Sequence, residues 1–268
     1  MGTKTGIQWT THTFNPWIGC TMVSAGCSNC YAARDNKRYK WVDEWNSPPK
    51  RTSESNWKKP LEWARSAAKD RELRRIFCAS LADVFDVNAP QEWREDLWNL
   101  INETGKLANG YLEWLILTKR PENIKSMWSN RVNFTPFVRL GITTENQLMA
   151  NERIPVFLDA WEGKNFISYE PAIGKLSLEK WMRSTTPAYK PLIDWVIIGC
   201  ESGSSARTTE DEWVRTLIDE ITYCNEEAHS LMPFRDPVKT FVKQLMVDGK
   251  LTKMPEFMGR VWDEFPEY

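Results

Sequence analysis

Three cysteines near the start of the chain are the residues whose type and spacing could do chemistry. Cys20, Cys27 and Cys30 follow the spacing C-x6-C-x2-C in a chain of 268 residues with six cysteines. The chain shows no sign of secretion, and thiols outside oxidising compartments stay reduced, so this group predicts a metal or iron-sulfur site rather than disulfides. A closed zinc site takes four protein ligands, whereas three thiolates leave one iron of a [4Fe-4S] cluster open. We expect the chemistry at that open position.

The sequence around these cysteines resembles a known superfamily. N-P-W-x-G-C before Cys20 and G-C-x-x-C-Y-A around Cys27 and Cys30 are similar to the cluster loop of radical S-adenosylmethionine (SAM) enzymes. Those enzymes usually carry C-x3-C-x2-C with an aromatic residue beside the last cysteine, here Tyr31; this chain departs by having six residues between the first two cysteines. More closely, nearly the whole chain resembles the phage Gp37/Gp68-type three-cysteine-motif family, from IQWTTHTFNPWIGC through SLADVFD, LTKRPENI and IIGCESG to GRVWDEFP.

The resemblance implies an α/β fold, a partial (β/α)6 TIM-like barrel of radical SAM type with an N-terminal cluster loop. The length of the chain and its residue patterns predict a single domain over residues 1–268, with an insertion or lid at 42–59 and a C-terminal covering segment at 246–268. The residues themselves predict a parallel α/β sheet or barrel, because short apolar runs alternate with helical patterns.

The elements expected from these patterns are short. Predicted strands cover residues 76–80, 114–118, 137–141, 165–168 and 195–199, after an extended segment that ends at Pro16, and 238–245 is a further candidate. Predicted helices cover 31–39, 60–75, 91–103 with Gly105 as the stop, and a segment after Thr209, which forms a capping-box pattern with Glu212. Parallel barrels build their sites after the carboxyl ends of the strands, and polar residues follow each predicted strand.

The resemblance suggests roles for those polar residues. In radical SAM enzymes the amino and carboxylate groups of SAM chelate the open iron, and polar residues after the middle strands hold the amino acid and ribose. By analogy Ser80 and Asp83 lie near the methionine end of SAM, Thr143 and Glu145 contact ribose, and Glu170 holds ribose or substrate. The resemblance thus assigns catalysis and metal binding to Cys20, Cys27 and Cys30, and cofactor binding to Tyr31, Ser80, Asp83, Lys119, Thr143, Glu145, Glu170 and Glu201.

Several of these residues have a structural alternative. Lys119 or Arg120 suits the carboxylate of SAM, but either could instead form a salt bridge to Asp83 or Glu170. His12 could donate a hydrogen bond to one of the residues that bind the cluster, or it could have a purely structural role. The remaining cysteines, Cys78, Cys200 and Cys224, are expected to pack as small apolar side chains.

The mechanism that the resemblance implies is reductive cleavage of SAM to methionine and a 5′-deoxyadenosyl radical, which abstracts hydrogen from a substrate. In a phage context the first substrate candidate is a hypermodified DNA base or its precursor, for instance an amino-acid-modified thymidine that is isomerised. An external electron donor is required, and a partner protein encoded nearby is compatible with the resemblance. The cationic and aromatic segment 34–51 could meet a nucleic-acid strand, or be a solvated helix end packed by its tryptophans.

Composition sets limits on these readings. The formal net charge of −1 gives no global attraction to phosphate, so any nucleic-acid face has to be local. The fifteen tryptophans are expected to serve mainly in core packing. There is neither a long apolar run of about eighteen residues nor a signal-peptide core. We therefore expect a cytoplasmic protein with no membrane partner, in the host cytoplasm if the chain is phage-encoded.

Two other functions also fit the cysteines. In the first, the three thiols and a fourth ligand, Cys200 or His12, close a structural zinc site without SAM chemistry. In the second, a structural iron-sulfur cluster supports a nucleic-acid-binding protein that consumes no SAM.

Overall fold

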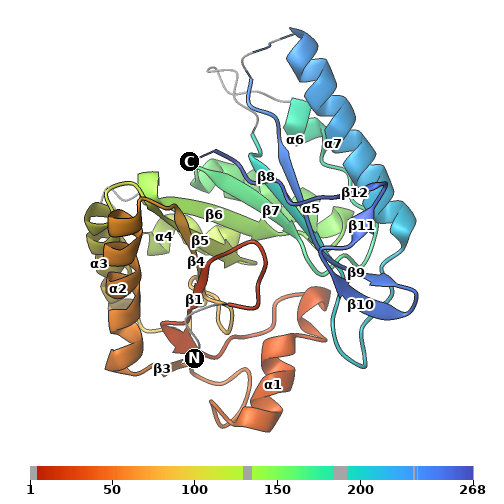
Figure 1. The fold of residues 1–268 in the computed structure, drawn as a ribbon. Coiled ribbons are helices and arrows are strands. Elements are labelled where there is room, and N and C mark those ends of the chain that lie inside the picture. Colours follow the sequence, from red (N-terminus) through yellow and green to blue (C-terminus); the bar gives the residue numbers. More distant parts are fainter. Residues whose placement is uncertain (1–4, 129–134, 184–191, 232, 234, 268) are drawn as a thin grey trace. The chain divides into compact units, whose positions relative to one another are not determined.

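The fold is that of a computed structural model, which describes residues 5–128, 135–183, 192–231, 233 and 235–267 (Figure 1). The chain forms two compact units. The first comprises Met1–Gly141 with Asp159–Lys164, and the second comprises Ile142–Leu158 with Asn165–Tyr268. Each unit combines helices with strands, so the predicted α/β class is confirmed.

The first unit is built on parallel strands. β1 (His12–Phe14) pairs with β4 (Arg74–Cys78), and β4 pairs with β5 (Leu112–Thr118), in parallel throughout. β6 (Val138–Thr143) is next in the strand order, and the chain passes into the second unit within this strand. Because parallel strands end at the same edge of a sheet, the residues that follow β1, β4 and β5 are brought together there.

Helices and short turns join the strands of the first unit. Their bounds are α1 (Tyr31–Tyr39), α2 (Glu54–Asp70), α3 (Gln91–Leu107) and α4 (Ile124–Met127), with 3-10 turns η1 (Ala25–Cys27), η2 (Pro121–Asn123) and η3 (Thr135–Phe137). Two short strands, β2 (Trp17–Ile18) and β3 (Lys50–Arg51), pair in antiparallel fashion beside the cysteine segment. Helices α2 and α3 pack side by side (Figure 1).

The second unit continues the pattern of parallel strands. β7 (Asn165–Tyr169), β8 (Trp195–Gly199) and β9 (Lys239–Val247) pair in parallel, and β10 (Lys250–Lys253) adds an antiparallel edge. The other elements are helices α5 (Gln147–Ala160), α6 (Glu179–Arg183) and α7 (Asp211–Leu231), and the hairpin of β11 (Glu256–Phe257) and β12 (Arg260–Val261). None of the described helices combines the length and the apolar character needed to cross a bilayer.

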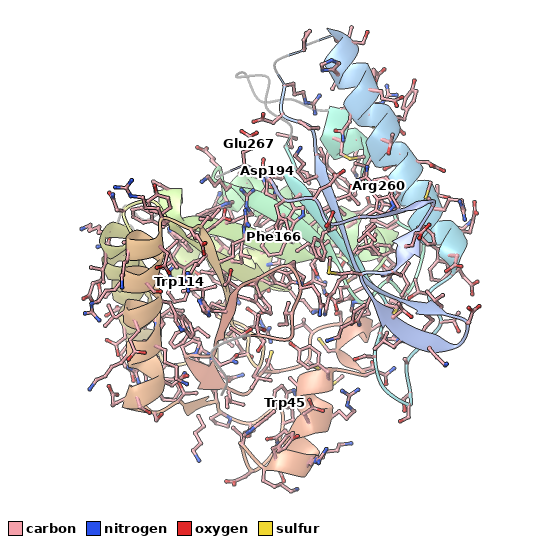
Figure 2. All side chains as sticks on the ribbon, viewed as in Figure 1. Trp45, Trp114, Phe166, Asp194, Arg260 and Glu267 are labelled. Carbon is pink, nitrogen blue, oxygen red and sulfur yellow. The ribbon has the colours of Figure 1, made fainter. Side chains whose placement is uncertain are left out.

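Aromatic side chains fill the core of each unit. Trp114, labelled in Figure 2, is fully buried in the first unit, where its ring meets that of Phe14 edge to face. In the second unit Trp195 contacts the rings of Phe166 and Phe241, all three fully buried. The prediction that tryptophans serve packing is confirmed for these residues.

Element types were predicted better than element bounds. The helix at 31–39 and the strand at 195–199 are confirmed as α1 and β8. The helix expected at 60–75 instead spans Glu54–Asp70, so residues 54–59 belong to α2 rather than to an irregular insertion. Pro60 suggested a helix start because proline lacks an N–H, yet it lies inside α2, where its neighbours Trp57 and Trp63 are buried. Burial of that apolar face outweighs the lost hydrogen bond.

Two predicted helix signals were wrong for identifiable reasons. Gly105 does not end α3, which runs to Leu107; a Cβ at Gly105 would lie 2.4 Å from Cγ of Phe137, so the glycine serves close packing. Thr209 does not cap α7, because its hydroxyl donates to the carbonyl of Ala172 at 2.6 Å. In both cases a tertiary contact uses the residue that local sequence assigns to a helix end.

The first unit contains a buried ion triad whose removal is testable. The Glu113 carboxylate is fully buried and accepts hydrogen bonds of 2.9 Å from Nε of Arg75 and of 2.9 Å from Nε of Arg139. Replacing Glu113 with Gln removes the buried negative charge that both guanidinium groups contact. We expect E113Q to lower the free energy of unfolding by about 3–5 kcal/mol, measured by urea denaturation.

The exposed pair of Lys125 and Asp159 in the same unit provides the control. Its side chains are 61% and 75% exposed, and its atoms lie 2.6 Å apart. Because solvent screens such a pair, D159A should change the free energy of unfolding by less than about 1 kcal/mol. Equal losses in the two variants would contradict the assignment of a structural role to Glu113.

Candidate metal centre

The three clustered cysteines lie on one continuous segment of the first unit. Cys20 follows β2, Cys27 ends η1, and Cys30 is the N-cap of α1. All three are free thiols with partly exposed side chains, whereas Cys78, Cys200 and Cys224 are buried. The thiols that the sequence selected are therefore the accessible ones, and the packing role expected for the other three is confirmed by their burial.

Gly19 determines how the segment enters this region. Its φ is +119°, and a Cβ there would lie 2.9 Å from Cα of Pro49, so only glycine fits without a shift of backbone. Its N–H donates to the carbonyl of Leu81 at 3.0 Å, and it forms a parallel bridge with Ala82. The residue before Cys20 is thus fixed to the loop that follows β4.

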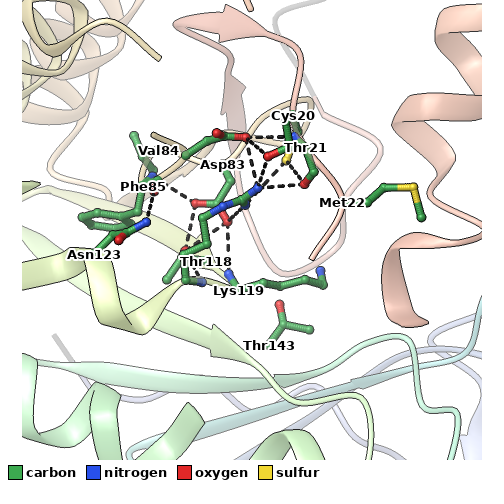
Figure 3. Close-up of polar contacts among 12 residues, drawn as sticks. Cys20, Thr21, Met22, Asp83, Val84, Phe85, Thr118, Lys119, Asn123 and Thr143 are labelled. Atoms are coloured by element: carbon green, nitrogen blue, oxygen red, sulfur yellow. Dashed lines mark hydrogen bonds and ion pairs between the residues drawn. The ribbon is translucent and has the colours of Figure 1, made fainter. Parts of the chain in front are cut away.

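Arg120 lies behind Cys20 and is itself buried, with 4% of its surface exposed. Its Nη1 lies 3.8 Å from Sγ of Cys20 and 2.9 Å from Oδ2 of Asp83, and its Nη2 lies 3.0 Å from Oδ2 of Asp86 (Figure 3). Nη2 also donates to the carbonyl and hydroxyl of Thr21, both at 2.7 Å. The structural alternative for Arg120, a salt bridge to Asp83, is confirmed.

Asp83 and Asp86 are held as firmly as the arginine between them. Asp83 accepts from the hydroxyl of Thr118 at 2.8 Å and from the backbone N–H groups of Phe85 and Lys119 at 3.0 and 3.1 Å. Asp86 Oδ2 accepts from the N–H and the hydroxyl of Thr21, both at 2.8 Å. The predicted cofactor ligand Asp83 therefore fixes neighbouring loops, whatever else it contacts.

Burial and charge shift the proton affinities of this group. Burial, with help from Asp83, raises the pKa of the Cys20 thiol to about 12, although Arg120 acts in the opposite direction. Burial alone would lower the pKa of Arg120, but Asp83, Cys20 and Asp86 together raise it above its ordinary value. Burial likewise opposes the charge of Asp86, yet its N–H donors and Arg120 hold its pKa below the usual range. The Asp86 carboxylate and the Arg120 guanidinium are therefore charged at neutral pH.

Ser80 and Tyr31, both predicted to contact cofactor, hold each other's loops in place. The Tyr31 hydroxyl donates to the carbonyl of Ser80 at 2.6 Å. Asn15 Nδ2 donates to the hydroxyl of Ser80 at 3.1 Å, while Asn15 Oδ1 accepts the N–H of Leu81 at 2.8 Å. The helix that carries Cys30 is thereby fastened to the end of β4.

Lys119 differs from its neighbour Arg120. Its side chain is partly exposed, and its ammonium makes no hydrogen bond or ion pair with the residues that the structure describes. Of the two cations considered for the carboxylate of SAM, Lys119 is the one that remains available.

The other predicted cofactor residues belong to the second unit, where their carboxylates already have cationic partners. Glu145 Oε1 accepts from Nη1 of Arg153 at 3.1 Å. Glu170 pairs with Lys243, and Glu201 Oε2 accepts from the backbone N–H of Arg207 at 2.8 Å and from its Nε at 3.0 Å. Sequence reasoning missed these three cations, because each comes from a later helix, strand or loop and no local pattern links it to its carboxylate.

Two threonine hydroxyls at the end of β6 stand out within the second unit. Oγ1 of Thr143 and Oγ1 of Thr144 are fully buried, and neither has a hydrogen-bond partner among the described residues. Leaving such a group without a partner costs about 1–3 kcal/mol. A bound molecule or water that accepts or donates there would remove this cost.

The donor chemistry of the cysteine segment suits an iron-sulfur cluster, although the thiols are not drawn together. Within the described ranges, no group of three or more His, Cys, Asp or Glu side chains is placed to hold a metal ion. Three accessible thiols in one short segment are nevertheless the ligand type that iron-sulfur clusters take. The ring of His12 stacks on that of Trp63, with 4.3 Å between the ring centroids.

The comparison with protein families gives a match over nearly the whole chain. The family model described as "Protein of unknown function (DUF5131)" matches residues 4–266. No curated protein and no solved structure matches the chain.

Differences in thiol reactivity follow from this environment. The thiolate is the nucleophile, and with a pKa of about 12 roughly one Cys20 in ten thousand is ionised at pH 8. For protein without added iron, we expect iodoacetamide to modify Cys27 and Cys30 well before Cys20, with Cys78 protected by burial. Timed alkylation followed by peptide mass spectrometry measures the order. Modification of Cys20 first at pH 8 would contradict the raised pKa assigned to its thiol.

Proposed function

The chain belongs to the DUF5131 family, whose description assigns no activity, and we propose from its residues that it is a radical SAM enzyme. The observation that carries the proposal is the set of three accessible thiols on one segment, Cys20, Cys27 and Cys30, in a chain whose other cysteines are buried. These three would hold a [4Fe-4S] cluster. Reduced by an external electron donor, such a cluster would supply the electron that cleaves SAM to methionine and a 5′-deoxyadenosyl radical.

The residues of the first unit have roles that their contacts support. Lys119 would bind the carboxylate of SAM, because its ammonium is partly exposed and makes no ion pair with the described residues. Tyr31 and Ser80, joined by a hydrogen bond of 2.6 Å, would keep the segment of Cys30 fixed to the end of β4. Asp83 would act indirectly, because its carboxylate holds the guanidinium of Arg120 in place.

For the second unit, the proposal of nucleotide or substrate contacts rests on the resemblance and on one further observation. Thr143 has a buried hydroxyl that makes no hydrogen bond to the described residues, which suits a ligand hydroxyl such as that of ribose. Glu145, Glu170 and Glu201 would contact ribose or substrate with oxygens that their cations orient. We also propose that the parallel strands belong to a partial (β/α)6 barrel of radical SAM type; the parallel pairing within each unit supports this.

The substrate that we propose is a modified DNA base or its precursor, such as an amino-acid-modified thymidine that is isomerised. The observations that support this substrate class come from one surface segment of the first unit. Around the end of α1, Lys37, Arg38 and Lys40 are exposed, and the guanidinium of Arg38 lies 5.2 Å from the ring centroid of Tyr39. The ring of Tyr39, with 54% of the residue exposed, stacks on Trp41 at 5.1 Å. Cations beside exposed aromatic rings suit the phosphates and bases of a nucleic-acid strand.

Anaerobic reconstitution tests the activity. Full-length protein treated with iron and sulfide should turn brown, and dithionite with SAM should then release 5′-deoxyadenosine, quantified by liquid chromatography. Replacing Cys27 with Ala should abolish both the colour and the release, because a cluster held by two thiolates has lost one of its three anchors.

Cys224→Ala is the matched control, since Cys224 is buried in α7 and should leave both readouts unchanged. Colourless protein that binds zinc and unfolds on chelation would favour the structural zinc site instead. Brown protein that releases no 5′-deoxyadenosine would favour the structural cluster of a nucleic-acid-binding protein.

Lys119→Met tests the proposed contact with the carboxylate of SAM. A hydrogen bond to a charged group contributes about 1.5–3 kcal/mol, so we expect the Kd for SAM of the iron-loaded protein to rise by about tenfold or more. Isothermal titration calorimetry measures this affinity. Lys125→Met removes a surface lysine that pairs with Asp159 and should leave the Kd unchanged. An unaltered Kd in the Lys119 variant would exclude this contact.

A further inference from the structure

The charge arrangement around Arg120 goes beyond what a structural ion pair requires. Two carboxylates, those of Asp83 and Asp86, meet its guanidinium at 2.9 and 3.0 Å, and Sγ of Cys20 lies 3.8 Å from its Nη1. All three charged side chains are at least nine-tenths buried. One guanidinium therefore serves two carboxylates and the first of the three clustered thiols.

The same guanidinium also fixes the backbone next to that thiol. Nη2 of Arg120 donates to the carbonyl of Thr21 at 2.7 Å, and Asp86 accepts the N–H of Thr21 at 2.8 Å. Thr21, which follows Cys20, is thus held at both its N–H and its carbonyl. Gly19, which precedes Cys20, is held by the hydrogen bond from its N–H to the carbonyl of Leu81. Arginine suits this task because its planar fork presents several donors in fixed directions, which a lysine ammonium does not.

We propose that Arg120 is a positioning residue that holds Cys20 as a cluster ligand and raises the reduction potential of the cluster. This inference rests on the proposed function, since it presupposes that the three thiols bind iron. A cation that donates toward a ligand sulfur stabilises the additional negative charge of the reduced cluster, and hydrogen bonds to the sulfurs are among the factors that set such potentials. Asp83 and Asp86 act in the opposite direction through their negative charge, so Arg120 offsets them at the point nearest to Cys20.

The test compares the midpoint potential of the loaded cluster among full-length variants. Arg120→Met keeps an unbranched apolar stem and removes the charge and the donors of the guanidinium. It should shift the potential to more negative values by about 59 mV or more, which for one electron is a tenfold change in the ratio of oxidised to reduced cluster. Arg120→Lys keeps the charge but not the fork, and should shift the potential in the same direction by less. A redox titration monitored by electron paramagnetic resonance gives the midpoint potential, and it detects only the protein that has bound a cluster.

Two further variants separate the effect of charge from damage to the fold. Asp83→Asn removes an anion beside the same guanidinium and should shift the potential to more positive values. Arg139→Met removes a buried arginine that contacts Glu113 rather than Cys20, so it should lower the melting temperature and leave the potential unchanged. Distortion of the loop alone would not reverse sign between Arg120→Met and Asp83→Asn.

The outcomes distinguish this inference from the proposed function. If the unaltered protein binds no iron, the proposed function fails. If it binds iron and both Arg120 variants keep its potential, or if Arg120→Met and Asp83→Asn shift the potential in the same direction, the role of Arg120 is wrong and the cluster stands. A folded Arg120→Met variant that loads no cluster, while Arg139→Met loads normally, supports the holding of Cys20. Where Arg120→Met does not fold, the potential of Arg120→Lys decides.

Discussion

A single buried guanidinium joins three stretches of the first unit that lie far apart in the sequence. Arg120 follows β5, the carboxylates of Asp83 and Asp86 follow β4, and Thr21 and Cys20 follow β2. Removing the guanidinium would leave both carboxylates buried without their shared cation, which is costlier than never having formed the pairs. The position of the first thiol thus depends on a balance of charge that spans a hundred residues of chain.

Ion pairs at the ends of strands recur in the second unit. Glu145 after β6, Glu170 after β7 and Glu201 after β8 each meet a cation from a later part of the chain. Carboxylates with low exposure are tolerated only when they are paired, and these cations supply the partners and fix the direction of the glutamate oxygens. Both units follow the same rule: an acidic residue follows a buried strand, and an arginine or lysine from a later position in the chain holds it.

The sequence predicted those features that depend on local pattern. Hydrophobic runs located the strands, and the helix that carries Tyr31 was predicted with its observed bounds. The three accessible thiols were separable from the buried ones by spacing alone. What the sequence did not reveal depends on tertiary partners. Pro60 and Gly105 act as helix ends in isolation, yet buried packing places both inside helices.

The same distinction between local sequence pattern and tertiary partners applies to the residues of the candidate site. The cysteines and the polar residues after the strands were recognisable, and the salt bridge of Arg120 with Asp83 was one of two alternatives that the sequence left open. Thr21 and Asp86 were not assigned roles, because a hydrogen bond between residues 65 positions apart leaves no periodic signal. Lys243 was missed for the same reason, since it lies 73 positions from Glu170. Arg153 and Arg207 lie 8 and 6 positions from their carboxylates, but neither spacing is a recognised pattern of a helix or a strand.

Gly19 carries a consequence for how this segment can vary among related chains. Its positive φ turns the chain immediately before the first thiol, and its missing Cβ makes room for the backbone of Pro49. A chain with a side chain at position 19 would have to reroute the loop around position 49 at the same time, and the sulfur would then emerge in a different direction. Positions 19 and 49 should therefore change together during evolution or not at all. The absence of a side chain at Gly19 thus restricts which residues and backbone paths the loop thirty residues later can adopt.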